Sequence, residues 1–334
     1  MALKVGINGF GRIGRNVLRA IIEGKRSGIE VVAINDLGSV ETNAHLLQFD
    51  SIHGRFPHDV TFDKQGIDAG CGLIRVTAER DPSLLNWSDV DVALECTGLF
   101  TDRDKAALHL KNGSKRVLVS APCSNADKTI VYGVNHNKLK IDDYVVSNAS
   151  CTTNCLAPVA KVLHKKFEIK TGYMTTIHSY TGDQPSLDTM HKDLYRGRAA
   201  SLSMIPTSTG AAKAVSLVLP ELEGKLDGSA IRVPTPNVSC IDFKFLTEKQ
   251  VSVLEINEEI KKAAEGELKG ILGFEERSLV SIDFNHWSAS STFASQETKV
   301  LPSGMVRVLS WYDNEWGFSN RMADTAIKIG SLLK

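Results

Sequence analysis

The feature that most constrains the fold of this 334-residue sequence is a G-x-G-x-x-G turn at Gly9–Gly14. An apolar run, Leu3–Asn8, comes directly before it, and apolar residues then recur at helical spacing over Arg12–Glu23. A run rich in β-branched residues follows at Glu30–Asn35. Strand, helix and strand in this order predict a βαβ unit with a parallel pairing.

The residues of this unit also predict a ligand. Gly9 permits a tight turn, Gly11 allows the backbone to approach a pyrophosphate, and Gly14 allows close packing of helix and strand. Asp36 ends the second strand about 20 residues further on, where a carboxylate accepts hydrogen bonds from ribose hydroxyls. Because that carboxylate would repel the additional phosphate of NADP, we predict that the cofactor is NAD.

Further short strands are predicted at Val90–Glu95, Arg116–Ser120 and Tyr144–Ser147, with helical segments between several of them. This alternation predicts an α/β fold with a doubly wound, Rossmann-type parallel sheet. The pattern changes after Asn148, where a helix is predicted over about Thr152–Phe167. Longer strands, separated mostly by loops, are then predicted at Thr171–His178, Ser229–Val233, Ile241–Leu246, Leu279–Asp283 and Met305–Trp311. The second half is therefore expected to be α+β, with a mostly antiparallel sheet.

A chain of this length is expected to form two domains. We place an NAD-binding Rossmann domain at residues 1–150, completed by a C-terminal helix at 315–334, and a catalytic domain at 151–314. The segment Ser179–Pro206 shows little periodicity, and a loop of that length is usually functional.

Composition excludes several classes of protein. The 39 basic residues balance the 39 acidic ones, so there is no net positive charge to bind nucleic acid or an anionic membrane. No apolar run is long enough for a transmembrane helix, and glycines interrupt the N-terminal run as they would not in a signal peptide. The six cysteines form no disulfide framework, which favours reduced thiols in the cytoplasm. No metal site is predicted.

The candidate nucleophile is Cys151, which lies where a strand ends and a helix begins. A thiol at a helix N-terminus is expected to have its pKa lowered by about a unit or more, because the dipole and free N–H groups stabilise the thiolate. Cys155 lies one helical turn further and is interpreted as structural. His178 is the candidate base, because it ends a β-rich run and enters the long loop.

At these residues the sequence resembles the phosphorylating glyceraldehyde-3-phosphate dehydrogenases over essentially its whole length. The matching stretches are Val5–Gly14, Ala33–Asp36, Glu95–Gly98, Ser147–Cys155, Thr176–Thr181, Pro206–Ala214, Ala230–Ser239 and Ser310–Arg321. The resemblance implies a homotetramer and oxidation of glyceraldehyde 3-phosphate with NAD and inorganic phosphate, through a thiohemiacetal and a thioester on Cys151.

The resemblance also implies roles for further residues. The phosphate of the aldehyde would be held by Thr181 and Arg232, with support from Asp183. Inorganic phosphate would be held by Ser150, Thr152, Thr209 and Gly210, helped by either Arg196 or Arg198. The cofactor contacts would include Arg12, Ile13, Arg80, Ser120 and, at the nicotinamide carboxamide, Asn314.

Two alternatives share many of these features. An erythrose-4-phosphate dehydrogenase would carry the same motifs and act on an aldehyde one carbon longer. A redox-sensing NAD-binding protein would use the same thiol without turnover. Thr189 and Met190 stand where many NAD-dependent relatives carry Leu-Pro, so the preference for NAD is expected to be weaker than Asp36 alone suggests.

Overall fold

The structure is a computed structural model that describes residues 2–333. The chain divides into two compact units. The first comprises Met1–Ile130, His136–Ala149 and Ser319–Lys334, and the second comprises Val131–Asn135 and Ser150–Phe318. The assignment of NAD binding to 1–150 with 315–334, and of catalysis to 151–314, stays a prediction, because compactness alone assigns no role to either unit.

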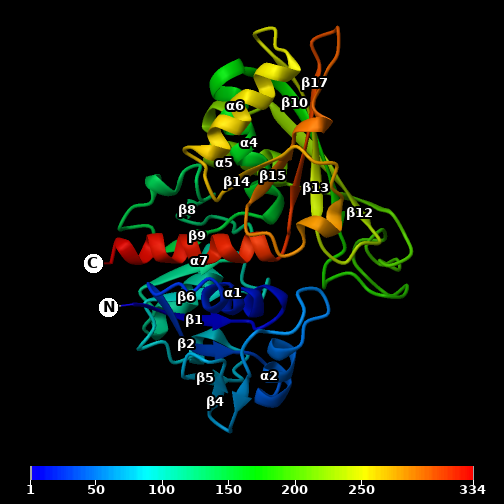
Figure 1. Ribbon diagram of the computed structural model, residues 1–334. Coiled ribbons are helices and arrows are strands. Elements are labelled where there is room, and N and C mark those ends of the chain that lie inside the picture. The colour runs from blue at the N-terminus through cyan, green and yellow to red at the C-terminus, as the bar shows by residue number, and fades with distance from the viewer. Residues whose placement is uncertain (1, 334) are drawn as a thin grey trace. The chain divides into compact units, whose positions relative to one another are not determined.

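A nine-stranded sheet forms the centre of the first unit (Figure 1). Its strands run in the order β3 (Thr61–Phe62), β4 (Gly66–Asp68), β5 (Leu73–Thr77), β2 (Ile29–Asn35), β1 (Leu3–Asn8), β6 (Val92–Glu95), β7 (Arg116–Val119), β9 (Val145–Ser147) and β8 (Lys128–Thr129). Every pairing from β5 to β8 is parallel, and only β3–β4 and β4–β5 are antiparallel. The strand order reverses at β1, which has β2 on one side and β6 on the other, so the predicted doubly wound sheet is confirmed.

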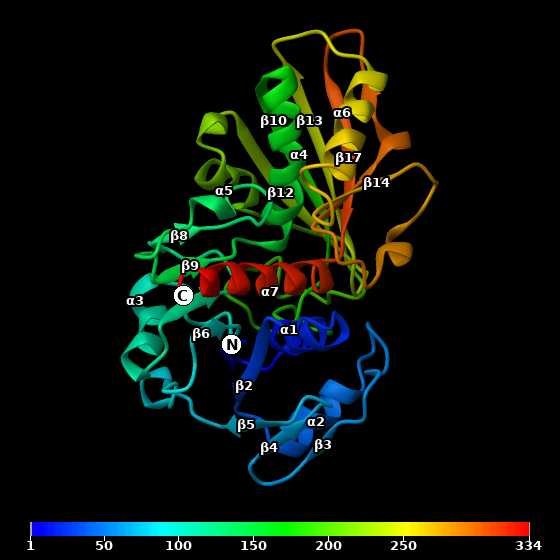
Figure 2. The same cartoon turned by 60° about the vertical axis from the view of Figure 1, so that its left-hand side comes forward.

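The helices of the first unit follow the sequence patterns. Helix α1 spans Arg12–Glu23, as predicted, and buries Val17, Leu18 and Ile21 at helical spacing. It contacts β2, beside which it lies in both cartoon views (Figures 1 and 2). The other helical segments are α2 (Val40–Gln48), α3 (Arg103–Ala106) and short 3-10 turns at Pro82–Leu84, Ala107–Asn112 and His136–Lys138.

A second, eight-stranded sheet forms the other unit. Its order is β11 (Ile205–Ser208), β12 (Leu226–Val233), β10 (Ile169–Ser179), β13 (Ser239–Thr247), β17 (Val306–Tyr312), β15 (Ser291–Ala294) and β14 (Leu272–Glu275), with β16 (Lys299–Val300) also paired to β17. Most pairings are antiparallel, as predicted, but β10–β12 and β14–β15 are parallel.

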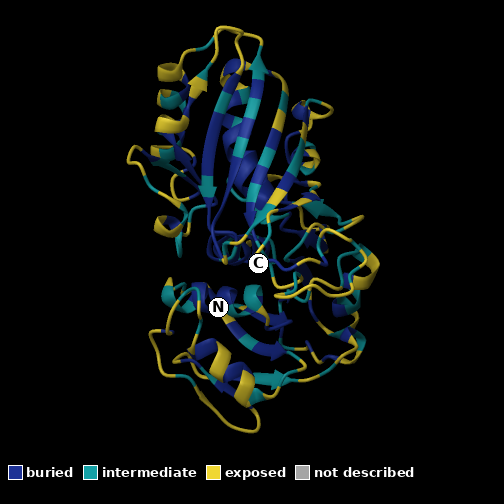
Figure 3. Cartoon of the chain, turned by 90° about the vertical axis from the view of Figure 1, so that its right-hand side faces the viewer, coloured by how far each residue is buried: buried dark blue, intermediate teal, exposed yellow. Residues whose placement is uncertain are grey.

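Helices cover one face of this second sheet. They are α4 (Cys151–Phe167), α5 (Ala211–Val218) and α6 (Val253–Glu265), which lie together on one side of the strands (Figure 2). Bands of buried and more exposed residues alternate along the long strands in Figure 3, as expected for a sheet with one covered face. Further 3-10 turns occur at Pro220–Leu222 and Ser295–Glu297, and α7 (Trp316–Ser331) leads the chain back to the first unit.

One predicted strand is wrong. Leu279–Asp283 contains no strand; instead a 3-10 turn forms at Ser281–Phe284. The Asp283 carboxylate accepts a hydrogen bond from Val280 N at 2.9 Å, which closes a local turn. Val280 and Ile282 are exposed rather than paired, so the apolar run has no neighbouring strand to join.

Within residues 2–333, no helix is both long and apolar enough to cross a membrane. The same range contains no group of three or more His, Cys, Asp or Glu side chains placed to hold a metal ion.

Candidate active site

Cys151 is the first residue of α4, the 17-residue helix of the second unit. Ser150 caps this helix, because its hydroxyl oxygen accepts a hydrogen bond from Thr153 N at 3.0 Å. Ala149, directly before the cap, has a positive φ of 56°, which marks the sharp turn into the helix. The local sequence therefore fixes the thiol at a helix N-terminus, one residue earlier than the predicted start of the helix.

His178 lies next to this thiol. Its Nε2 is 3.5 Å from Cys151 Sγ, and its Nδ1 is 2.6 Å from the carbonyl oxygen of Ser179. Arg232 Nη1 also lies 3.0 Å from Nδ1, but its two N–H groups have acceptors in the Ser179 carbonyl oxygen and Thr181 Oγ1. A carbonyl oxygen only accepts hydrogen bonds, and an unprotonated Nδ1 would place two acceptors 2.6 Å apart, so Nδ1 carries the proton and Nε2 presents a lone pair to the sulfur. The imidazole is thus in the tautomer that can remove the thiol proton.

Burial governs the protonation of both groups. It raises the pKa of the Cys151 thiol above its ordinary value, although Arg232 and hydrogen bonds from Thr152 act in the opposite direction. Burial, followed by the nearby Arg232 charge, lowers the pKa of His178 to about 3. The prediction of a lowered thiol pKa is wrong, because desolvation outweighs the Arg232 charge and the hydrogen bonds at the helix terminus. At neutral pH the pair is a thiol and a neutral imidazole.

Sequence reasoning missed Tyr312, which supports both residues. Its hydroxyl lies 2.8 Å from Thr152 Oγ1 and 2.9 Å from Thr176 Oγ1, and its ring meets the His178 ring edge-on. Thr176 donates its own proton to the carbonyl oxygen of Cys240 at 3.1 Å, so Tyr312 donates to Thr176 and accepts from Thr152. The hydroxyl of Thr152 is therefore used within the protein. Tyr312 is the last residue of β17 and lies within the matching stretch Ser310–Arg321, but nothing in its spacing indicates these contacts.

Arg232 comes to His178 through strand pairing. The two residues are register partners in the parallel pair β10–β12. Arg232 Nη1 donates to the carbonyl oxygen of Ser179 at 2.9 Å and to Thr181 Oγ1 at 3.1 Å. Its buried Nε has no hydrogen-bond partner among the described residues. A guanidinium with an unused buried donor beside the nucleophile is suited to an anionic substrate.

Two further charged residues extend this cluster. Thr181 donates to Asp183, and Asp183 pairs with Arg196 Nη1 at 3.3 Å. Arg196 Nε also donates to Thr207 Oγ1 at 3.0 Å. Arg198 instead pairs with Asp188 at 2.8 Å and is more exposed than Arg196. Of the two arginines that sequence reasoning left open, Arg196 is the one joined to Arg232 through Thr181 and Asp183.

Residues predicted to hold inorganic phosphate lie at two helix N-termini. Thr153 Oγ1, at the start of α4, is 3.4 Å from the carbonyl oxygen of Ala211, the first residue of α5. Thr209 Oγ1 accepts from Ala211 N at 3.1 Å, and Gly210 caps α5 without a side chain. Ser150 Oγ in turn lies 2.8 Å from Thr153 Oγ1, so the structure brings Ser150 close to the α5 terminus at Thr209 and Gly210. Paired helix N-termini favour an anion.

Asn314 is also held in a defined orientation. Ser239 Oγ accepts from Ser179 N at 3.0 Å and donates to Asn314 Oδ1 at 2.9 Å. Asp313 caps the start of α7 by accepting from Glu315 N and Trp316 N. The Asn314 side chain therefore directs its oxygen at Ser239, and its amide nitrogen is not used in that bond.

The glycine turn in the first unit is shaped to receive a dinucleotide. A Cβ on Gly14 would lie 2.1 Å from the carbonyl oxygen of Gly9, so a side chain there would block the packing of α1. Around Gly11 a Cβ would meet nothing within 4 Å, and this N-cap offers no side-chain acceptor to the first turn of α1, which begins with Arg12 and Ile13. Open space at a helix N-terminus fits a pyrophosphate.

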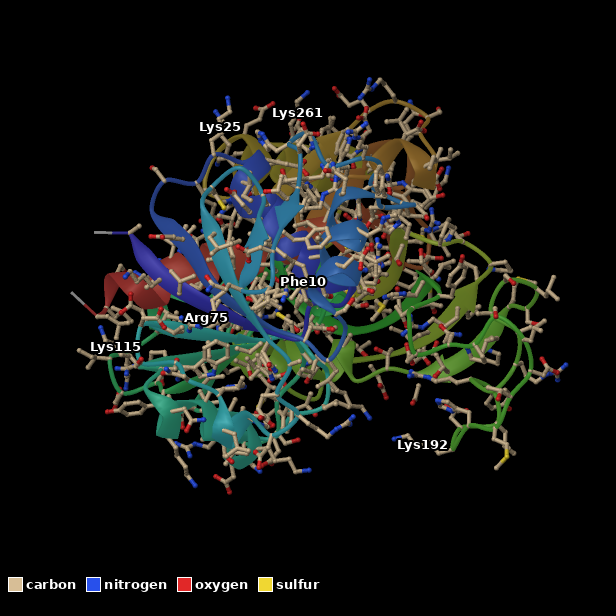
Figure 4. All side chains as sticks on the ribbon, turned by 90° about the horizontal axis from the view of Figure 1, so that it is seen from below. Phe10, Lys25, Arg75, Lys115, Lys192 and Lys261 are labelled. Atoms are coloured by element: carbon tan, nitrogen blue, oxygen red, sulfur yellow. The ribbon has the colours of Figure 1, made fainter. Side chains whose placement is uncertain are left out.

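Asp36, Arg80 and Ser120 are the other predicted cofactor contacts in the first unit. The Asp36 carboxylate accepts from Phe10 N at 2.8 Å and from Gly38 N at 2.9 Å, which leaves it lone pairs for ribose hydroxyls. Phe10, labelled in Figure 4, is fully buried. Arg80 is exposed, and Ser120 N donates to the carbonyl oxygen of Glu95 at 2.9 Å.

Arg12 is committed to a protein partner. Its Nη1 lies 2.6 Å from Asp50 Oδ2, and this bond lowers the pKa of Asp50 to about 2 even though burial acts in the opposite direction. A pyrophosphate at this helix would therefore meet the main chain of Arg12 more directly than its guanidinium.

Comparison with known proteins adds the following. Residues 3–103 match the family profile described as the NAD binding domain of glyceraldehyde 3-phosphate dehydrogenase, and residues 150–314 match the profile of its C-terminal domain. A glyceraldehyde-3-phosphate dehydrogenase of Cereibacter sphaeroides is 68% identical over 333 residues, covering 100% of both chains. One of Xanthobacter flavus is 68% identical over 99% of this chain and 100% of its own. One of Geobacillus stearothermophilus is 57% identical over 99% of each.

Proposed function

The chain belongs to the glyceraldehyde-3-phosphate dehydrogenase family, and we propose that it oxidises glyceraldehyde 3-phosphate to 1,3-bisphosphoglycerate with NAD and inorganic phosphate. The observation that carries this proposal is the contact of 3.5 Å between Cys151 Sγ and the lone-pair side of His178 Nε2. Within this family, we place the enzyme in the phosphorylating, NAD-dependent class, EC 1.2.1.12.

The alternatives are less well supported. Relatives over the full length carry the name glyceraldehyde-3-phosphate dehydrogenase, which does not favour an erythrose-4-phosphate enzyme. A peroxide sensor needs a thiolate with a low pKa, whereas burial raises the pKa of Cys151.

The first step uses the neutral pair as the structure presents it. The thiol proton passes to His178 Nε2 while Sγ forms a bond to the aldehyde carbon, giving a thiohemiacetal oxyanion. The main-chain N–H of Cys151 and the newly protonated imidazole are donors for this oxyanion. The neighbouring Arg232 charge disfavours a permanent imidazolium. His178 is therefore protonated only while the oxyanion is present.

NAD, when bound, supplies the hydride acceptor that converts the thiohemiacetal to a thioester. His178 releases its proton to solvent at this stage. Hydrogen phosphate then attacks the thioester carbon, the C–S bond breaks, and the proton of the phosphate passes through His178 to the departing sulfur. The products are the acyl phosphate and the free thiol, so protons and electrons balance over the cycle. A thioester retains the energy of the oxidation for transfer to phosphate.

We assign the two phosphates to the two polar clusters of the second unit. Arg232 and Thr181, supported by Asp183, would hold the phosphate of the aldehyde. Ser150 with the α5 terminus at Thr209 and Gly210 would hold inorganic phosphate, and Thr152 would contribute its main chain because its hydroxyl contacts Tyr312. The NAD contacts would be Gly9, Gly11, Arg12, Ile13, Gly14, Asp36, Arg80, Ser120 and Asn314.

The two loop arginines offer a matched test of this assignment. We expect Arg196→Ala to raise the KM for phosphate or for the aldehyde by about tenfold, because it breaks the ion pair that orders Asp183 beside Thr181. Arg198→Ala removes an equal charge from an exposed pair and should change either KM by less than about twofold. Steady-state kinetics with each substrate varied in turn distinguishes the two. Equal effects of both substitutions would contradict the assignment.

We further propose a cytoplasmic homotetramer. The loop between β10 and β11, which carries Lys192 in Figure 4, exposes the apolar side chains of Leu187, Met190 and Leu194. Exposed apolar groups of this kind are typical of a surface that another subunit covers. Light scattering measures the mass directly.

The activity itself is tested by following NADH formation from glyceraldehyde 3-phosphate with and without inorganic phosphate. We expect sustained turnover only with phosphate, because deacylation needs its attack on the thioester. Erythrose 4-phosphate is the comparison substrate and should give a lower kcat/KM. A rate that is independent of phosphate, or a preference for the longer aldehyde, would overturn the proposal.

A further inference from the structure

A buried carboxylate, which the mechanism above does not use, lies at the switch point of the first sheet. Glu95 is the last residue of β6, pairs in register with Asn8 of β1, and is 1% exposed. Strands β1 and β6 are the pair at which the strand order reverses, and ligands of such sheets bind beyond the carboxyl ends of these strands.

Four donors converge on this carboxylate. Oε2 accepts from Asn8 Nδ2 at 2.7 Å and from His109 Nε2 at 2.9 Å. Oε1 accepts from Thr97 N at 2.8 Å and from the Thr97 hydroxyl. All four bonds run toward Glu95, so a residue at this position must accept on both oxygens and donate on neither.

The protonation of His109 follows from its other neighbour. Its Nδ1 is 2.8 Å from Trp87 Nε1, and an indole nitrogen can only donate. His109 therefore accepts at Nδ1 and donates at Nε2 to Glu95. The indole is itself fixed, because it lies so close to β1 that a Cβ on Gly6 would be 2.7 Å from its ring.

The network reaches the glycine turn from two directions. Asn8 precedes Gly9, and its Oδ1 accepts from Asn35 Nδ2 at 2.8 Å, next to Asp36. Thr97 lies against Gly9, where a Cβ would be 2.7 Å from Thr97 N. Thr97 Oγ1 also accepts from Leu99 N at 3.0 Å, which fixes the partly exposed turn after β6. Glu95 thus joins the two turns that border the expected dinucleotide.

We propose that Glu95 is a positioning residue of the NAD site, whose buried carboxylate holds the Gly9 turn and the Thr97–Leu99 turn in the arrangement that accepts the dinucleotide. The proposal rests on the proposed function, because it assigns NAD to this edge of the sheet. Trp87 and His109 support this role, because the bond from Trp87 keeps His109 Nε2 directed as a donor at Glu95 Oε2.

Glu95→Gln tests the proposal with little change in shape. The glutamine NH₂ must face donors, either Thr97 N or the pair from Asn8 and His109, so one set of bonds is lost. We expect the Kd for NAD, measured by calorimetry on the full-length protein, to rise about tenfold. Amide hydrogen exchange over residues 96–99 should become faster, and the KM for the aldehyde should stay within about twofold.

Two further variants complete the experiment. Trp87→Phe keeps the ring against Gly6 but removes the donor to His109, and should raise the Kd for NAD about two- to threefold. Glu275→Gln is the matched control, because it neutralises a buried carboxylate of the second unit that accepts from Arg277. It should leave the Kd for NAD unchanged.

The outcomes separate the possible roles. A lower melting temperature in Glu95→Gln with an unchanged Kd for NAD and unchanged exchange over residues 96–99 would show a purely structural role and overturn the proposal. If Glu95→Gln does not fold, an unchanged Kd in Trp87→Phe overturns it. Wild-type protein that binds NAD but does not oxidise the aldehyde would refute the proposed function, whereas the Kd comparison would still decide the role of Glu95.

Discussion

Replacing Cys151 by serine is expected to lower kcat by at least about 10³-fold, because removal of a catalytic nucleophile can cost about 10⁶-fold. A serine hydroxyl at the same helix terminus stays 3.5 Å or so from His178 but is far more weakly acidic than a thiol, so the same base ionises it poorly. An ester formed on serine would also release its acyl group to phosphate more slowly than a thioester does.

The experiment compares Cys151→Ser with Cys155→Ser. Cys155 lies one turn further along α4, is buried, and has its sulfur 3.2 Å from Ser291 Oγ. A serine hydroxyl at this position can form a hydrogen bond with the Ser291 hydroxyl, so we expect kcat within about threefold of wild type. Both variants should bind NAD as the wild type does, measured by calorimetry. Substantial turnover in Cys151→Ser, or an equal loss in both, would show that the nucleophile is assigned wrongly.

The local parts of the fold could be predicted from the sequence because they depend on neighbouring residues. The strand, glycine turn and helix over residues 3–23 follow from apolar spacing and from three glycines, and the structure has the helix at the predicted bounds. Cys151 at a helix N-terminus follows in the same way from Ser150 as the cap. The strand predicted at Leu279–Asp283 failed because a single side chain, Asp283, closes a turn there.

Non-local features could not be predicted in this way. Arg232 reaches His178 only because β10 and β12 pair in parallel, whereas the sequence favoured antiparallel neighbours. Tyr312 contacts residues more than 100 positions away, and no spacing rule indicates this. The choice of Arg196 over Arg198 depends on how the loop folds around Asp183 and Asp188.

The pKa of the Cys151 thiol is another property that could not be predicted from the sequence. The helix terminus at Cys151 is visible in the sequence, but the burial that opposes it is a property of the folded unit. A helix dipole is worth about 0.3–1 kcal/mol at an exposed site, whereas full burial can shift a pKa by several units. The thiol is therefore activated by its partner base rather than by its position on the helix.

That conclusion makes His178→Asn the second decisive substitution. Asparagine can still donate a hydrogen bond to an oxyanion but cannot take up the thiol proton. We expect kcat to fall by about 10²- to 10⁴-fold at neutral pH, the range typical for loss of a general base. His164→Asn is the matched control, because His164 Nδ1 accepts a hydrogen bond from Ile169 N at 3.0 Å, which an asparagine oxygen can also accept.

The pH profile distinguishes loss of the base from general damage. In the wild type the proton moves within the pair, so the thiol step should vary little with pH from well above the His178 pKa of about 3 up to the raised pKa of the thiol. Without His178 the thiolate must form by loss of a proton to solvent, and its fraction rises tenfold per pH unit below the thiol pKa. The rate of thiol alkylation and kcat in His178→Asn should therefore both rise steeply with pH. A flat profile in this variant would mean that another group takes the proton, and His178 would then serve only as an oxyanion donor.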